Sequence, residues 1–168
     1  MELEFRHDLD CDGPTYFDRC IYDDEFWTRV YGEILKFPKF ETLEMKKDGD
    51  VWTRTVRIEP PITGLPGPAK KVIGDRMSYV EVGTYDKKTG RYSFKVTPST
   101  FPDKVKTEGV MWCEPRGDKK STRIAKITVE VKIFVVGGMI QDKIASDLRQ
   151  SYDATASFTN QWVKEKGL

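Results

Sequence analysis

IFVVGGMIQDKI, residues 133–144, is the stretch that decides the fold. An apolar run meets two adjacent glycines, Gly137 and Gly138. Beyond them the pattern changes, because Ile140 and Ile144 stand four residues apart, at helical spacing. The stretch therefore predicts a strand that leads into a helix. A glycine pair at such a junction either cradles a phosphate or lets the backbone bend, and the two alternatives imply different classes of protein.

The sequence around the glycine pair lacks the companions of a phosphate site. A dinucleotide-binding fingerprint needs GxGxxG inside a strand–helix–strand unit, and a phosphate loop needs GxxxxGK[ST]. Neither motif is present, and no strand follows the helix. We therefore expect Gly137 and Gly138 to act as a structural hinge, where positive φ and close approach let the strand turn sharply onto its own sheet.

The rest of the chain reads as a strand, two short helices, a series of strands and a final long helix. The amino-terminal strand shows the alternation Leu3, Phe5, His7, Leu9, and the short helices begin near Asp12 and Asp23. A crossing at 59–71 contains four prolines and two glycines, which predicts irregular structure. Alternating apolar residues predict further strands at 40–45, 51–58, 76–85, 91–96, 105–113 and 122–136. The final helix is expected from Met139 onward, about 40 Å long.

Consecutive hairpins predict an antiparallel sheet, because parallel neighbours need long crossovers. The expected fold class is α+β: a curved antiparallel sheet of about six to seven strands wrapped around the long carboxy-terminal helix, a helix grip. We expect one domain spanning residues 1–168. A wrapped sheet and one helix rarely fill the space between them, so a ligand cavity is expected there. The inner faces of 76–85 and 105–113 are left open by the alternation.

The composition of the chain limits the classes of partner and the cellular compartment to expect. Lys and Arg number 28 against 27 Asp and Glu, so no excess charge favours nucleic acid. No apolar run approaches the ~20 residues of a membrane helix, so no membrane-spanning segment is expected, and transient membrane contact is left open. The charged amino terminus is unlike a signal peptide, and three cysteines without CxxC spacing are typical of reduced thiols. We expect a cytoplasmic protein; the sequence does not indicate its oligomeric state.

Metal and catalytic signatures are weak. The acidic stretch DLDCDG (8–13) imitates the opening of a calcium loop, but Arg19 stands where the bidentate Glu belongs. His7 is the only histidine, and its alternation with Leu and Phe is more typical of an inner residue than of a catalytic one. The prediction is therefore no metal site, no cofactor and no assigned catalytic residue.

Arg54 is the unusual polar residue, because it shares an apolar face with Trp52 and Val56. A buried unpaired charge is very costly, so a buried Arg54 needs a partner or a polar ligand. Glu81, on the same face as Tyr79, is a candidate partner. The alternatives are that Arg54 extends to the rim or that the opposite face is the inner one.

Three local motifs resemble one family. They are LPGPAKK (65–71), VEVKIFVVGGMIQDKI (129–144) and FTNQW (158–162). With the order of elements, they resemble the START-like (helix-grip, SRPBCC) superfamily, closest to a bacterial branch of unknown function, over essentially the whole chain. The resemblance implies a deep, mostly apolar cavity between the sheet and the long helix. It supplies no reaction.

The function favoured is a carrier or sensor that binds a hydrophobic small molecule, such as a lipid, a sterol-like or a polyketide-like compound. One alternative is an enzyme of the polyketide cyclase or aromatase kind, using Glu81, a tyrosine or His7 as acid or base; the other is an interaction module with a filled core. A non-enzyme is the preferred reading, and the crossing at 59–71 is expected at the entrance. The residues expected to bind the ligand are Arg54, Val56, Tyr79, Glu81, Tyr92, Phe94, Val96, Ile127, Val129, Val131, Ile140, Ile144, Leu148 and Tyr152.

Overall fold

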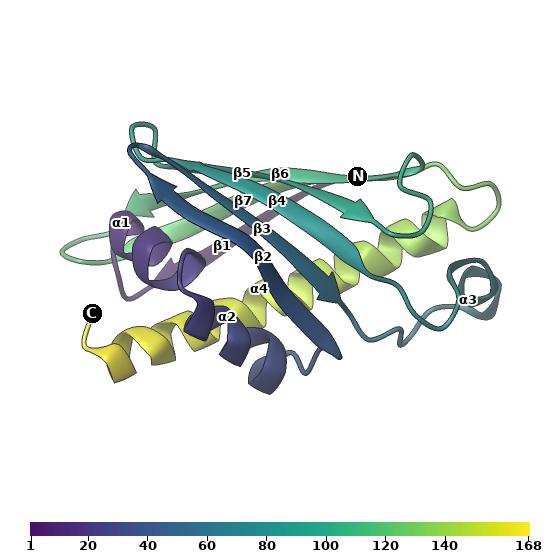
Figure 1. Cartoon of the computed structure of the whole chain (residues 1–168), viewed down its shortest axis with the longest axis horizontal. Helices are drawn as coiled ribbons and strands as arrows, with labels where there is room; N and C mark the ends of the chain where they lie inside the picture. Colours follow the sequence, from purple (N-terminus) through teal and green to yellow (C-terminus); the bar gives the residue numbers. More distant parts are fainter.

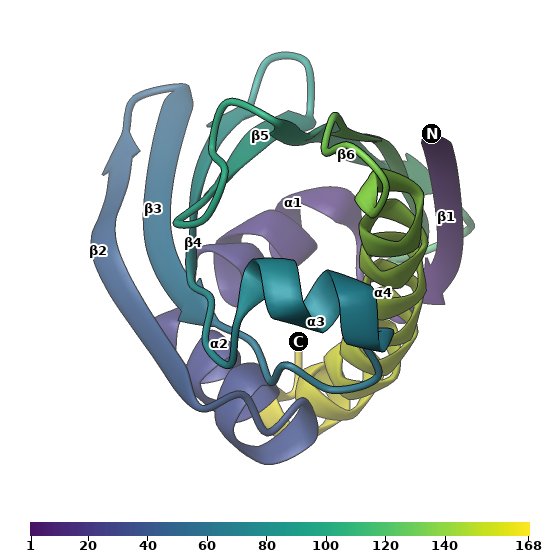
Figure 2. The same cartoon turned by 90° about the vertical axis from the view of Figure 1, so that its right-hand side faces the viewer.

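A computed structural model describes residues 1–168. Seven strands form one antiparallel sheet in the order β1-β7-β6-β5-β4-β3-β2. The sheet curves so that its concave side faces the long helix α4 (Figures 1 and 2). The predicted helix-grip fold is thus confirmed. The elements are β1 (Glu2–Leu9), β2 (Lys39–Asp48), β3 (Val51–Glu59), β4 (Tyr79–Asp86), β5 (Arg91–Pro98), β6 (Val105–Pro115), β7 (Ser121–Val131) and α4 (Gly137–Lys166).

The two short helices after β1 form where their capping residues predict. Asp12 accepts a hydrogen bond from Thr15 N at 2.8 Å and caps α1 (Gly13–Tyr16). Asp23 accepts one from Phe26 N at 2.9 Å and caps α2 (Asp24–Arg29). Each helix continues into a π-helical turn, η1 (Phe17–Ile21) and η2 (Val30–Ile34). These side-chain caps satisfy backbone N–H groups that a helix start leaves unpaired.

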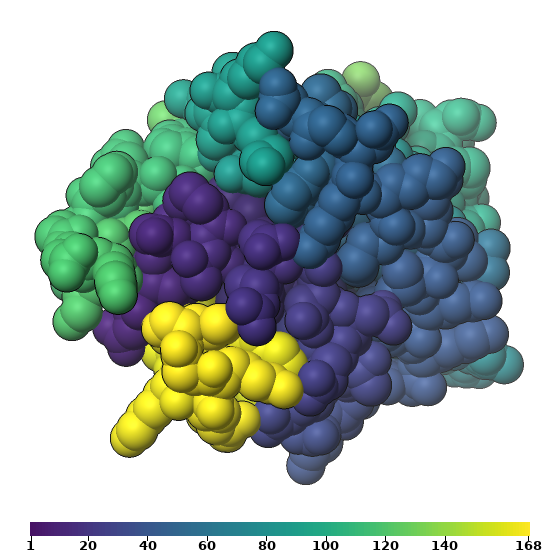
Figure 3. Space-filling model, turned by 60° about the vertical axis from the view of Figure 1, so that its left-hand side comes forward, coloured from purple at the N-terminus to yellow at the C-terminus, as the bar shows by residue number.

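Aromatic side chains fill the interior at the α1 end of the molecule. Phe17 stacks on Tyr85 with ring centroids 4.1 Å apart. Trp162 of α4 is 2% exposed, and its indole N–H donates to Arg19 O at 3.0 Å. Phe17, Tyr85 and Trp162 belong to a core cluster of 22 buried residues. Figure 3 shows the amino-terminal helices lying between the sheet and the end of α4, so this end is closed.

The junction between β7 and α4 corrects the sequence prediction at both of its boundaries. The strand ends at Val131 rather than 136. Lys132 N still donates to Lys104 O, and a turn at 134–136 follows, in which Val136 N donates to Phe134 O. The helix begins at Gly137 rather than Met139. Positive φ occurs at Val135 (+69°), and at neither glycine of the pair.

The two glycines of the pair differ in their surroundings. A Cβ on Gly137 would lie 2.7 Å from Val131 O, so the close approach of helix and strand depends on this glycine. A Cβ on Gly138 would meet no atom within 4 Å. The close approach expected of the pair is therefore found at Gly137 alone.

The predicted irregular crossing at 59–71 contains the start of a helix, α3 (Gly67–Ile73), which is a second correction. Ala69 and Ile73 of this helix pack against Val136 and Ile140 in a separate small cluster. Burial against α4 stabilises a helix that is too short to persist alone. Figure 2 shows α3 lying across the end of the sheet opposite to α1. No helix is both long and apolar enough to span a membrane.

Candidate ligand-binding site

The strand register places the predicted site residues on one face of the sheet. Residues directly opposite each other in antiparallel pairs share a face. One row across the sheet runs Arg54, Gly83, Phe94, Gly109 and Ile127. The next row towards α3 runs Val56, Glu81, Val96, Thr107 and Val129. Because Ile127, Val129 and Phe94 are buried in the core, this face is the inner one, which also assigns the inner faces of β4 and β6.

Half of the fourteen predicted residues are buried and half keep part of their surface accessible. The buried ones are Arg54, Val56, Tyr92, Phe94, Ile127, Val129 and Ile140. The partly accessible ones, which we call the inner patch, are Tyr79, Glu81, Val96, Val131, Ile144, Leu148 and Tyr152.

The inner patch indicates accessible space between the sheet and α4. β4 and β5 are central strands, so their inward side chains cannot reach solvent around a sheet edge. Nevertheless, the Glu81 side chain is 19% exposed and Val96 is only partly buried. Ile144, Leu148 and Tyr152 supply the opposite wall from the middle of α4. The largest buried cluster thus lies at the α1 end, and the inner patch lies between it and the small cluster at α3.

A polar cluster lies where the largest buried cluster meets the inner patch. Arg54 is 2% exposed, and its Nη1 lies 3.0 Å from Glu81 Oε1. The Tyr92 hydroxyl donates to the same oxygen at 3.0 Å, and burial raises the pKa of Tyr92 well above 10, so the hydroxyl keeps its proton. The Arg54 guanidinium also lies over the Trp27 ring, 4.4 Å from its centroid. Arg54 is therefore buried with Glu81 as its partner and does not extend to the rim.

Two strand glycines make room for inward aromatic rings, and the sequence reasoning missed both. A Cβ on Gly83 would lie 1.8 Å from the Tyr92 hydroxyl, so Tyr92 crosses β4 only because residue 83 has no side chain. A Cβ on Gly109 would lie 2.7 Å from Phe94 Cζ. Isolated glycine within a strand is a sequence signal of close approach, and it was available at both positions.

A second polar cluster, around Arg123 on β7, involves His7. Arg123 Nη2 donates to His7 Nδ1 at 3.0 Å and to Tyr152 O at 2.9 Å, and Nη1 donates to Tyr16 Oη at 3.1 Å. Because a guanidinium can only donate, His7 Nδ1 accepts and His7 Nε2–H donates to Asp153 at 2.7 Å. Burial lowers the pKa of His7 below 6.5. Both ring nitrogens are therefore engaged, and neither is free to act on a ligand.

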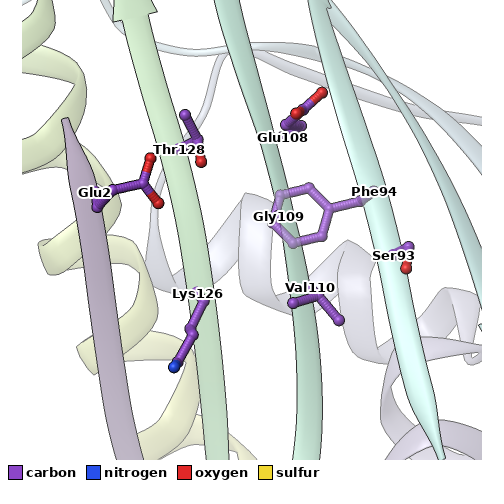
Figure 4. Close-up of a pocket in the computed structure, with 8 residues that line it drawn as sticks. All are labelled: Glu2, Ser93, Phe94, Glu108, Gly109, Val110, Lys126 and Thr128. Atoms are coloured by element: carbon purple, nitrogen blue, oxygen red, sulfur yellow. The ribbon is translucent and has the colours of Figure 1, made fainter. Parts of the chain in front are cut away.

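Two further hollows lie on the outer surface. One of about 410 Å³ lies over β1, β7, β6 and β5 and is lined by Glu2, Ser93, Phe94, Glu108, Gly109, Val110, Lys126 and Thr128 (Figure 4). The other, of about 510 Å³, lies on α4 and is lined by Ser146, Arg149, Gln150, Asp153, Ala154 and Ser157. Both are lined mostly by polar residues, unlike the expected apolar site. Only Phe94 of the predicted residues takes part.

Comparison with known proteins agrees with this architecture. A model of a family described as "Protein of unknown function (DUF2505)" matches residues 5–163. No curated protein matches the chain. Among solved structures, TTHA0849 from Thermus thermophilus has a TM-score of 0.68 at 12% identity, covering 100% of both chains.

Two other solved structures show the same fold. The Zhui aromatase/cyclase from Streptomyces sp. R1128 has a TM-score of 0.67 at 11% identity, covering 97% of this chain and 95% of that one. A START superfamily protein from Mycobacterium smegmatis has a TM-score of 0.62 at 16% identity, covering 95% and 97%. The START-like fold expected from the sequence motifs is confirmed.

Proposed function

The chain belongs to the DUF2505 family of unknown function, and we propose that it binds a hydrophobic small molecule between the sheet and α4, as a carrier or sensor. The observation that carries the proposal is the inner patch: side chains on central strands face inward and yet remain accessible. Buried apolar side chains are the default in a packed core, so accessible ones there favour a space that a ligand fills.

The chemistry of the inner patch favours an apolar ligand with few polar groups. Val96, Val131, Ile144 and Leu148 supply aliphatic surface, whereas Glu81 is the only charged member. Burial of about 300 Å² of ligand surface would contribute roughly 7 kcal/mol before the ordering costs of binding are subtracted.

A cyclase-like enzyme is the second candidate, and one observation favours it. Glu81 places a carboxylate at the inner patch, where it could serve as a general base for a bound substrate. The similarity to the Zhui aromatase/cyclase is consistent with this candidate through the fold alone. Turnover that is lost in Glu81→Gln while binding persists would favour the enzyme over the carrier.

Binding of the neutral dye N-phenyl-1-naphthylamine tests the carrier proposal. The dye should fluoresce on binding to the wild-type protein, and Leu148→Trp should weaken its binding at least tenfold by filling the inner patch. Met139→Trp is the matched control, because Met139 is 41% exposed on the same helix and should leave binding unchanged.

Native mass spectrometry of protein purified gently from its own host should in addition detect a reproducible extra mass. Failure of the wild type to bind the dye, together with the absence of any bound mass, would refute the proposal. That outcome would favour an interaction module with a filled core.

A further inference from the structure

We propose that the ligand is a neutral apolar molecule carrying a hydroxyl group, an alcohol or phenol, which donates a hydrogen bond to Glu81 Oε2. The inference rests on the proposed function and specifies the chemistry of the same site. It excludes a carboxylate head group, as in a fatty acid, from contact with Glu81.

The two oxygens of Glu81 have different surroundings. Oε1 accepts from both Arg54 Nη1 and Tyr92 Oη at 3.0 Å, so its capacity is largely used. Oε2 takes part in no hydrogen bond within the protein. Oε2 is also not fully buried, because the only fully buried side-chain atoms without hydrogen-bond partners are nitrogens of Arg54 and Arg123. Oε2 is therefore an accessible acceptor on the inner patch, and an ionised carboxylate oxygen can only accept.

The buried cations are withheld from a ligand. Arg54 Nη1 donates to Glu81, and its Nε and Nη2 are buried beside the Trp27 ring. Arg123 donates to Tyr16, His7 and the Tyr152 carbonyl, and its remaining Nε is buried too. An anion entering the inner patch would thus meet the carboxylate of Glu81 without reaching a guanidinium nitrogen.

Two tyrosines of the inner patch carry further hydroxyl groups. Tyr79 and Tyr152 belong to the inner patch, and the charge of Glu81 acts on the pKa of each. Burial is the main cause that raises the pKa of both above 10, so both hydroxyls stay protonated and neutral. Neither hydroxyl group forms a hydrogen bond within the protein, and neither is among the fully buried polar atoms that lack a partner. Both hydroxyls are therefore neutral donors on the inner patch, available to polar groups of a ligand.

Three probes of similar shape test the inference: 2-naphthol, 2-methoxynaphthalene and 2-naphthoic acid, each displacing N-phenyl-1-naphthylamine at neutral pH. We expect 2-naphthol to bind the wild-type protein at least tenfold more tightly than the other two. Glu81→Gln should reduce this preference to threefold or less, because a neutral amide oxygen is a weaker acceptor than an ionised carboxylate oxygen. Glu108→Gln, on the outer face of β6, is the matched control and should keep the preference.

The wild-type series decides the matter even if Glu81→Gln folds poorly. Equal binding of 2-naphthol and 2-methoxynaphthalene, or tighter binding of 2-naphthoic acid, would overturn the hydroxyl inference while the carrier proposal stands. A protein that binds no dye at all would instead refute the carrier proposal itself.

Discussion

Gly83→Ala tests whether the polar cluster depends on a missing side chain. The new Cβ would lie 1.8 Å from Tyr92 Oη and 2.2 Å from Tyr92 Cζ. Non-bonded atoms prefer separations of about 3.5–4.0 Å, so the ring must move by roughly 1.5 Å. Its hydrogen bond to Glu81 is 3.0 Å long and would not survive such a shift. The substitution should therefore break the hydrogen bond between Tyr92 and Glu81 although neither of these residues is replaced.

The expected loss of unfolding free energy is roughly 2–5 kcal/mol. Overpacking a core costs about 1–3 kcal/mol. A hydrogen bond to a charged group contributes about 1.5–3 kcal/mol. Replacing Gly by Ala within a strand returns about 0.5–1 kcal/mol, because the unfolded chain loses freedom. Gly83 does not have positive φ, so no backbone strain is added.

Urea unfolding followed by tryptophan fluorescence measures this loss. In a Tyr92→Leu background the ring is gone, so Gly83→Ala should become nearly neutral, which a double-mutant cycle detects as a coupling energy. Gly32→Ala is the control, because a Cβ there would meet no atom within 4 Å. A cost below about 0.5 kcal/mol in the wild type, or an equal cost in both backgrounds, would refute the reasoning.

Three further predictions concern the β7–α4 junction and the sole histidine. Gly137→Ala should destabilise the protein by about 1–3 kcal/mol, because the new Cβ clashes with Val131 O. Gly138→Ala should stabilise the protein by about 0.5–1 kcal/mol, because its Cβ meets no atom. Equal effects of the two substitutions in thermal unfolding would contradict this. Val135→Asn should raise stability by about 1 kcal/mol, because Val135 adopts φ +69° and is 75% exposed; an unchanged urea midpoint would argue against strain there. The pKa of His7 lies below 6.5 in the folded state, so the unfolded chain binds the extra proton and stability falls as the pH drops below 6.5. His7→Gln should flatten the change in unfolding free energy between about pH 7 and about pH 5.5, and an unaltered slope would count against this assignment.

The sequence predicted the sheet well because its strands alternate cleanly and its turns are short. Alternation also misled at one place, since Ile133 and Val135 continue the period of two beyond the real end of β7. A β-branched residue at positive φ is rare, so nothing in the sequence placed the turn at Val135. Likewise, prolines and glycines indicated irregular structure at 59–71, whereas packing of Ala69 and Ile73 on α4 stabilises a helix there.

The inner face was predictable in part, but its division into packed and accessible parts was not. Period-two alternation indicated the candidates on β3, β5 and β7, and helical spacing indicated those on α4. The inner face of β4, which carries Tyr79 and Glu81, is assigned by the strand register. Which of them stay accessible depends on how far the amino-terminal helices reach into the concave side, a tertiary property with no local signal. Glu81 was named from the sequence as a candidate partner of Arg54, because a charge buried in an apolar face needs an opposite charge, and the two side chains do pair.

The position of the polar cluster has a consequence for how a ligand would be oriented. Phe94, in the row from Arg54 to Ile127, is the strand aromatic of the main core cluster that lies nearest to α3, and Glu81 lies one row nearer to α3. A hydroxyl group that reaches Glu81 would therefore sit at the deep end of the accessible space. The apolar part of the same molecule would extend towards Val131, Ile144 and α3, where aliphatic side chains predominate. We therefore expect the ligand to bind with its hydroxyl group innermost. Shortening the apolar part should then weaken binding by about 0.8 kcal/mol for each methylene removed, while the preference for a hydroxyl group is kept.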